Sequence, residues 1–250
     1  MRRLLAVLAM TSAVVVGGCD SGSSPSSSSW SPSPPTSPAA PSPSKPAERP
    51  LPDPAALLKQ SSATTKNLKS AHLVLSVAGK VAQMPVQTLE GDLTNDPKPA
   101  AKGDAMIDIM GAEVNVKFAV FHRRLYVAMP GGEWRDYGFA SGTYDVTRTL
   151  NPAVGLANML ANFVDPKVDG RETVDDQQTI RVSGKVTVDA VNKFVPQLGA
   201  TTRMSSTVWI QERGDHEVVE ATLEPSREDF VQMKLSKWNE PVTIDKLDKL

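Results

Sequence analysis

Three histidines are the first candidates for metal binding or proton transfer, because a neutral imidazole binds metals and titrates near neutral pH. His72 lies at the predicted start of a strand, and His122 and His216 lie in predicted turns. They show neither HExxH spacing nor a shared face, and the sequence has no Gly-x-Ser-x-Gly motif and no phosphate-binding glycine-rich loop. Asp175-Asp176 and Glu224 are read as turn and strand-end residues, although carboxylates distant in sequence can still pair in space. The sequence therefore predicts no catalytic residue, no metal site and no cofactor.

The single cysteine, Cys19, has a setting that predicts modification of its thiol. Arg2 and Arg3 precede an apolar run over residues 4–16, which is typical of a secretory signal peptide and too short for a stable transmembrane helix. Residues 16–19, Val-Gly-Gly-Cys, resemble the lipobox of bacterial lipoproteins, in which diacylglycerol is added to the cysteine before the leader is cleaved. We expect a signal peptide over residues 1–18 and lipidation of Cys19; a plain secreted protein is the alternative.

The next segment, residues 19–50, is predicted to be a tether. Between Asp20 and Lys45 it carries no other charge and consists almost entirely of Ser and Pro. Such a composition cannot bury enough apolar surface to fold. The folded domain is expected over residues 51–250, held by the lipid on the outer face of the cytoplasmic membrane, with partial release or association with the cell wall as alternatives. The net charge of −1 gives no basic excess for nucleic acid, and no second apolar segment is long enough to cross a bilayer.

Hydrophobic periodicity predicts an α+β domain with a large antiparallel sheet and helices on one face. Asp53 and Pro54 are typical of a helix start, and the stripe of that helix comprises Leu57, Leu58, Ser61, Thr65 and Leu68. Alternating apolar residues then predict strands near 73–77, 89–93, 105–109, 114–120, 168–174, 179–184, 207–211, 218–223 and 231–235. Tight turns are expected at 95–97, 110–111, 122–124, 175–176 and 214–215, and a short helix at 188–195.

A second helix, predicted from an Asn151 cap to about Phe163, is apolar over well over half its circumference. A helix that covers a sheet needs a stripe of little more than 100°. Its additional apolar surface is covered either by other helices or by a ligand in a cavity between the helices and the sheet. On the second reading the cavity wall comprises Leu75, Ala105, Ile107, Ile109, Val116, Phe118, Leu156, Met159, Leu160 and Phe163. Each methylene moved from water into such a cavity would gain about 0.8 kcal/mol.

Several runs resemble the mycobacterial LprG/LppX lipoprotein family, and its LprG members most closely. They are residues 68–72 (LKSAH), 88–93 (TLEGDL), 150–152 (LNP), 155–158 (GLAN), 160–163 (LANF), 179–186 (TIRVSGKV), 207–212 (TVWIQE) and 235–238 (LSKW). The runs keep their order over essentially the whole domain. The basic turn His122-Arg123-Arg124 departs from the expected smaller, less charged turn and leaves the head-group preference open.

The resemblance implies a half-barrel sheet whose concave face and helices enclose a cavity for acyl chains. It implies ligands such as triacylated phosphatidylinositol mannosides, lipomannan, lipoarabinomannan and triacylglycerol, handled together with a major-facilitator exporter. It also implies recognition by Toll-like receptor 2 of a host. Two alternatives remain: a structural or regulatory envelope adaptor without a ligand, which a filled core would favour, and a lipid hydrolase, which would need a nucleophile with a base in reach.

Overall fold

The structure is a computed structural model that describes residues 49–79, 81 and 84–244. The chain divides into residues 1–48 and a compact unit over residues 49–250. Cys19, the leader and most of the predicted tether therefore lie outside the described residues. The elements of the compact unit are α1 (Pro54–Lys66), β1 (Ser70–Ala78), β2 (Val86–Thr94), β3 (Ala100–Ile109), β4 (Ala112–Phe121), β5 (Arg124–Ala128), β6 (Trp134–Phe139), the 3-10 turns η1 (Ala140–Gly142) and η2 (Val146–Leu150), α2 (Leu156–Ala161), β7 (Phe163–Val174), β8 (Gln177–Val186), α3 (Val188–Phe194), the 3-10 turn η3 (Pro196–Leu198), β9 (Met204–Gln211), β10 (Val218–Glu224) and β11 (Phe230–Ser236).

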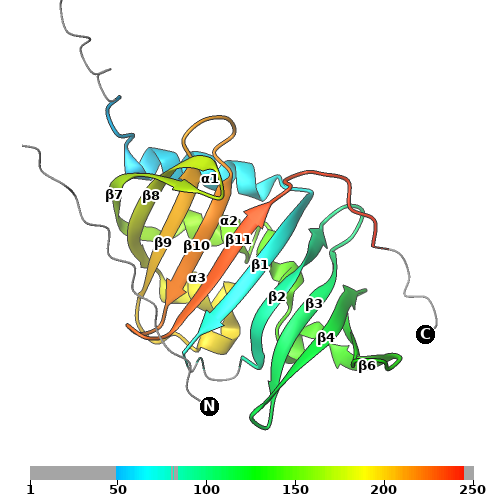
Figure 1. Ribbon diagram of the computed structural model, residues 1–250. Coiled ribbons are helices and arrows are strands. Elements are labelled where there is room, and N and C mark those ends of the chain that lie inside the picture. The colour runs from blue at the N-terminus through cyan, green and yellow to red at the C-terminus, as the bar shows by residue number, and fades with distance from the viewer. Residues whose placement is uncertain (1–48, 80, 82–83, 245–250) are drawn as a thin grey trace, which may run out of the picture. The chain divides into compact units, whose positions relative to one another are not determined.

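One antiparallel sheet of 11 strands contains all of these strands, in the order β6-β5-β4-β3-β2-β1-β11-β10-β9-β8-β7. Strands that follow one another in the sequence pair in the sheet, except β6 and β7, which form its two edges. In addition, β1 pairs with β11. The first and last strands thus meet in the middle and join two meanders (Figure 1). The helices gather on one face of the sheet (Figure 1), and the predicted α+β architecture is confirmed.

Helix α1 begins as its sequence predicts. The Asp53 carboxylate accepts a hydrogen bond from the backbone N–H of Ala56 at 2.7 Å, and Pro54 is the first helical residue. Its predicted stripe is buried, including the polar residues Ser61 and Thr65. The helix is attached to the following layer by Ser62, whose hydroxyl donates to the carbonyl of Ala157 in α2 at 2.8 Å.

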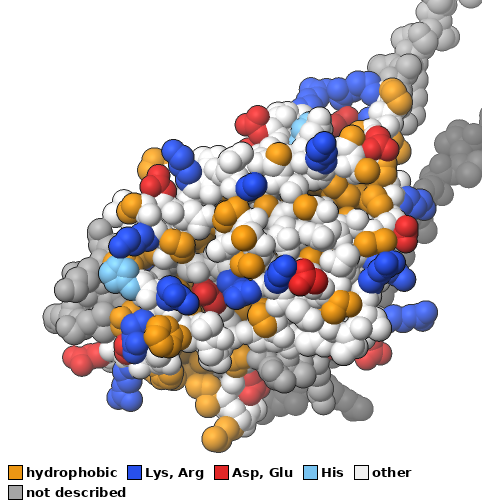
Figure 2. Space-filling model, turned by 180° about the vertical axis from the view of Figure 1, so that it is seen from behind, with side chains coloured by type: hydrophobic (Ala, Val, Ile, Leu, Met, Phe, Trp, Pro, Cys, Tyr) orange, Lys and Arg blue, Asp and Glu red, His pale blue; other side chains and the backbone are white. Residues whose placement is uncertain are grey.

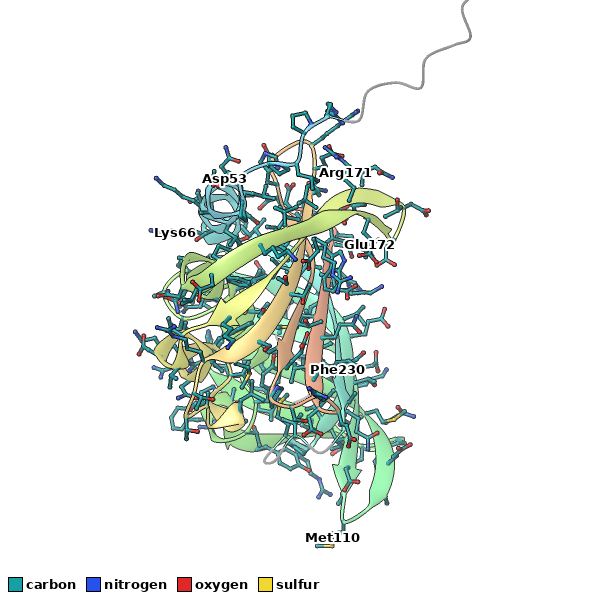
Figure 3. The ribbon with its side chains drawn as sticks, turned by 90° about the vertical axis from the view of Figure 1, so that its left-hand side faces the viewer. Asp53, Lys66, Met110, Arg171, Glu172 and Phe230 are labelled. Carbon is teal, nitrogen blue, oxygen red and sulfur yellow. The ribbon has the colours of Figure 1, made fainter. Side chains whose placement is uncertain are left out.

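The start of α1 is fixed to the end of the sheet formed by β7 and β9. Arg171 of β7 donates to Glu212 at 2.9 Å and to the carbonyl oxygen of Pro50 at 3.2 Å. Arg49 forms a second ion pair with Glu212 at 3.3 Å. The guanidinium of Arg171 holds the pKa of Glu212 below its ordinary value, because it stabilises the charged carboxylate. The compact unit therefore begins at a defined place, next to Asp53 in Figure 3.

The second predicted helix is shorter than expected, and the predicted start at Asn151-Pro152 is wrong. Residues 152–154 form a turn in which the Asn151 side chain accepts a hydrogen bond from Ala153, and α2 begins only after Gly155. A Cβ on Gly155 would overlap the carbonyl oxygens of Arg148 and Thr149, so only glycine fits at this position. At the other end Phe163 pairs with Val186 and opens β7, because a strand partner far along the chain replaces the next helical turn.

Two further strands were not predicted. β5 and β6 occupy the segment after the basic turn, and β6 is an edge of the sheet. The remaining predicted strands, the turns and the helix at 188–195 are confirmed, with ends that coincide or are shifted by up to five residues.

The inner face of the sheet is covered differently in its two halves. α2 packs against α1, α3 and η2, and the buried side chains Leu73, Ile180, Val208 and Met233 form the core below these elements. β2 and β3 instead contact η2, a single 3-10 turn. A 3-10 segment covers less area than an α-helix. The half of the sheet formed by β2–β6 therefore has the thinner cover.

Gly91 of β2 and Gly103 of β3 face each other. A Cβ at Gly91 would come within 2.5 Å of the carbonyl oxygen of Lys102, and a Cβ at Gly103 would overlap that of Glu90. In the same cross-strand row, Gly91 is opposite Leu73 and Gly103 is opposite Phe118. Neither position has room for a side chain, so the glycine pair allows the two strands to approach closely here.

Candidate functional site: an apolar cavity

A cavity of about 450 Å³ lies between the inner face of β2–β6 and the segment at 143–146. Five of the residues predicted from alternation line it, namely Ala105, Ile107, Ile109, Val116 and Phe118. Ala105 is opposite Leu89 on one side and Val116 on the other, and Phe118 is opposite Val127. Because directly opposed residues of antiparallel strands point to the same face, these side chains form one continuous apolar wall.

The other five predicted residues do not line this cavity. Leu75 is fully buried in the core beside Leu89 and Met233. On α2, Leu156, Met159 and Leu160 are buried in the same core, and Phe163 is a half-buried residue of β7. Neighbouring α1 and α3 cover α2, so other helices take up its additional apolar surface.

Sequence reasoning missed the far wall of the cavity. Leu125 and Val127 of β5 and Tyr137 of β6 complete the sheet side, and Tyr144 and Val146 belong to the cover. Leu125 and Val127 alternate with Arg124 and Tyr126, and this short period-2 run could have indicated β5. The cover shows no such signal, because its 3-10 turns follow from local capping such as the hydrogen bond from Thr147 N to Asp145 at 3.2 Å.

The cavity wall is almost entirely apolar. Among the described residues that line it, Asp108 carries the only formal charge, and its carboxylate is already used by the backbone N–H of Gly111 at 2.8 Å. Tyr144 is buried, its hydroxyl has no hydrogen-bond partner among the described residues, and burial raises its pKa. Removal from water disfavours the phenolate, so Tyr144 remains neutral. This lining suits an alkyl chain better than any polar or charged molecule.

The volume sets the size of such a chain. An apolar cavity of about 150 Å³ holds one benzene, or six carbons, so this cavity of about 450 Å³ has room for on the order of eighteen carbons. That is the length of one long acyl chain. The space in this conformation therefore fits one chain.

The basic turn lies away from this wall, between β4 and β5. His122 and Arg123 both have positive φ, and the His122 ring lies 4.1 Å from that of Phe121. Arg124 donates to Asp136 at 2.6 Å, which lowers the pKa of that carboxyl. Arg124 also lies 5.5 Å from the centre of the Phe139 ring. The charge of Arg124 is thus already matched by Asp136 on the adjacent edge strand.

The described part of the chain contains no group of three or more His, Cys, Asp and Glu side chains placed to hold a metal ion. His72 lies with Nδ1 2.7 Å from Asp92 and Nε2 3.4 Å from Glu90.

Within residues 49–79, 81 and 84–244, no helix has the length and apolar character needed to cross a membrane.

Comparison with known proteins decides the family. The family described as LppX_LprAFG lipoprotein matches residues 53–244, which is nearly all of the compact unit. The chain belongs to this lipoprotein family. The resemblance inferred from the sequence runs is therefore confirmed.

Relatives and solved structures of the LppX_LprAFG family agree. A protein named lipoarabinomannan carrier protein LprG from Mycobacterium leprae (strain TN) is 45% identical over 248 residues, covering 98% of this chain and 95% of its own. The protein of the same name from Mycolicibacterium smegmatis is 42% identical, with 98% and 95% covered. LprF from Mycobacterium bovis superimposes with a TM-score of 0.71 at 28% identity, covering 79% of this chain and 98% of its own. LppX from Mycobacterium tuberculosis gives 0.62 at 28% identity, covering 76% and 97%.

Proposed function

We propose that this family member is a carrier that shelters an acyl chain of an envelope glycolipid in the cavity under β2–β6. The observation that carries the proposal is the apolar cavity of about 450 Å³, which is sized for one long chain. The ligands proposed are triacylated phosphatidylinositol mannosides, lipomannan and lipoarabinomannan, together with triacylglycerol. The name of the relatives, lipoarabinomannan carrier protein, supports this class.

The energetics suit transport more than tight storage. An eighteen-carbon chain kept from water is worth on the order of 14 kcal/mol, at about 0.8 kcal/mol for each methylene. A bilayer interior protects the same chain equally well, so moving it from bilayer to cavity is close to neutral in free energy. A carrier can therefore both take up and release its ligand at membranes, while free lipid in water stays rare.

The proposed binding residues are Ala105, Ile107, Ile109, Val116 and Phe118, which line the cavity. Lipidation of Cys19 would hold the carrier on the outer face of the cytoplasmic membrane. A major-facilitator exporter in that membrane is the proposed partner, and Toll-like receptor 2 is a proposed host partner of the lipidated protein. The presence of a cavity supports the carrier over an adaptor that binds no ligand.

Native mass spectrometry of the protein purified from its own host tests the proposal. We expect a co-purified mass matching an acylated glycolipid or triacylglycerol, lost on mild delipidation and regained from vesicles that contain a triacylated phosphatidylinositol mannoside. A protein that folds normally but carries no lipid from its host, and takes none from such vesicles, would refute the carrier function.

A further inference from the structure

The hairpin between β3 and β4 ends in an unexpected side chain. Met110 is fully exposed, at 103% of its reference area, and has a φ of 56°. Left-handed backbone at a hairpin turn favours Gly, Asn and Asp. Among the described non-glycine residues with positive φ, Met110 is the one apolar side chain; the others are His122, Arg123, Asp165, Asp175, Asp176, His216, Lys237 and Asn239.

This tip is a fixed projection of the molecule. The Asp108 carboxylate accepts a hydrogen bond from Gly111 N at 2.8 Å, which closes the turn, and Gly111 follows with a φ of 86°. Figure 3 shows Met110 at the extreme end of the domain, opposite Asp53. Seen from behind, the lower projection ends in hydrophobic side chains (Figure 2). An apolar residue held out in this position at a cost in backbone conformation points to a contact outside the described chain.

The tip is continuous with the cavity. Ile109, the residue before Met110, is 38% exposed and also lines the cavity. Tyr137 of the edge strand β6 is 54% exposed and lines the cavity as well. Tyrosine carries an apolar ring and a polar hydroxyl, which suits the boundary between hydrocarbon and water. Ile109 therefore links the exposed tip to the cavity wall, and Tyr137 is a second exposed residue of that wall.

The charge of the tip favours hydrocarbon over an anionic surface. Residues 108–113 read Asp-Ile-Met-Gly-Ala-Glu and contain no Lys or Arg, while Asp108 and Glu113 are opposite each other across the hairpin. An anionic partner would be repelled by these two carboxylates. Insertion would thus be limited to the turn itself and driven by apolar burial.

We propose that the hairpin tip, formed by Ile109 and Met110, inserts into the surface of a lipid bilayer and passes an acyl chain into the cavity. The inference rests on the proposed carrier function and adds the place where the ligand crosses between bilayer and protein. The chain then moves from one apolar medium to another without exposure to water. Since residues 108–113 carry two carboxylates and no basic residue, anionic lipid in the vesicles should not increase uptake.

The test compares Met110→Asp with Leu51→Asp in the full chain carrying Cys19→Ser, so that no lipid anchor holds the protein on vesicles. Leu51 is a matched control because it is an exposed apolar residue, at 46%, two residues before Asp53, which lies at the opposite end of the domain in Figure 3. Two measurements are made on each variant: the rate of extraction of pyrene-labelled phosphatidylinositol from phosphatidylcholine vesicles, and the equilibrium binding of a fluorescent fatty acid dissolved in water. Met110 does not line the cavity, so the second measurement reports on the cavity alone.

We expect Met110→Asp to slow extraction by at least about tenfold, because the variant loses the burial of a whole Met side chain in the bilayer. Its fatty-acid binding should be unchanged, Leu51→Asp should match the parent in both measurements, and Met110→Leu should restore extraction. Equal extraction by Met110→Asp and the parent, or equal slowing by Leu51→Asp, would overturn the bilayer contact while leaving the carrier function intact. Absence of fatty-acid binding by the parent protein would instead overturn the carrier function and this inference together.

Discussion

Replacing Ala105 with tryptophan tests whether the space beside β3 holds the ligand. Ala105 is buried, is opposite Leu89 and Val116, and lines the cavity. An indole adds nine heavy atoms, which at the benzene ratio of about 25 Å³ per carbon fills about 225 Å³. That is about half of the 450 Å³ cavity. Ala105→Trp should therefore fold normally, because the new side chain enters existing space.

The same substitution should abolish lipid uptake. With half the space occupied, about nine methylenes of an eighteen-carbon chain lose their place, which costs up to about 7 kcal/mol at 0.8 kcal/mol each. The assay measures the melting temperature and the uptake of a triacylated phosphatidylinositol mannoside from vesicles. Met106→Trp is the control, because this half-buried neighbour on β3 does not line the cavity.

Two outcomes would refute the reasoning. A loss of about 1–3 kcal/mol of stability would show that Ala105 belongs to a tightly packed core, as overfilling of a close-packed interior does. A stable Ala105→Trp protein with full uptake would show that the chain binds elsewhere. Stability with lost uptake, and normal uptake by Met106→Trp, is the result that the cavity predicts.

Three further predictions address the anchor, the glycine pair of β2 and β3, and the start of the domain. Cys19→Ala should leave the protein unprocessed or released into the medium, and normal membrane retention in a fractionation experiment would contradict lipidation. Gly103→Ala should lower the free energy of unfolding, measured in denaturant, by about 1–3 kcal/mol, because its Cβ would overlap a backbone carbonyl. Gly142→Ala is the control: a Cβ there would have no atom within 4 Å, so the free energy of unfolding should stay nearly unchanged. Arg171→Met should lower the melting temperature at pH 7. The difference in melting temperature from the parent protein should shrink as the pH falls below 4.5, the ordinary pKa of a glutamate, because the lowered pKa of Glu212 contributes stability only while its carboxyl is ionised. A difference in melting temperature that does not change with pH would contradict the ion pair.

Much of the sheet could be predicted because its strands are half-buried. Leu73 and Leu75 alternate with half-buried neighbours, and Val116 lies between the exposed Asn115 and Lys117; this pattern sets both the strand and the inward face. The tip at Met110-Gly111 and the turn at Asp175-Asp176 were visible as breaks between such runs.

Other parts depend on contacts that a local pattern does not contain. The apolar run through Leu160 and Phe163 is compatible with a continuing helix, and only the pairing of Phe163 with Val186 makes it a strand. The position of the cavity depends on which half of the sheet receives α-helices and which receives the short turn near Val146. Periodicity identified the inward residues of β3 and β4, but it could not show that space remains beside them and not beside Leu75.

Arg171 and Glu212 fix the beginning of the compact unit at the pole of the domain opposite Met110. If Cys19 carries the proposed lipid anchor, the chain is held from one pole of the domain while the proposed bilayer contact lies at the other. The ten residues of β4 alone span about 33 Å. Residues 19–48 would have to reach back over at least this distance for the tip to meet the membrane that holds the anchor. Shortening them is therefore expected to slow loading from that membrane more than loading from a separate vesicle.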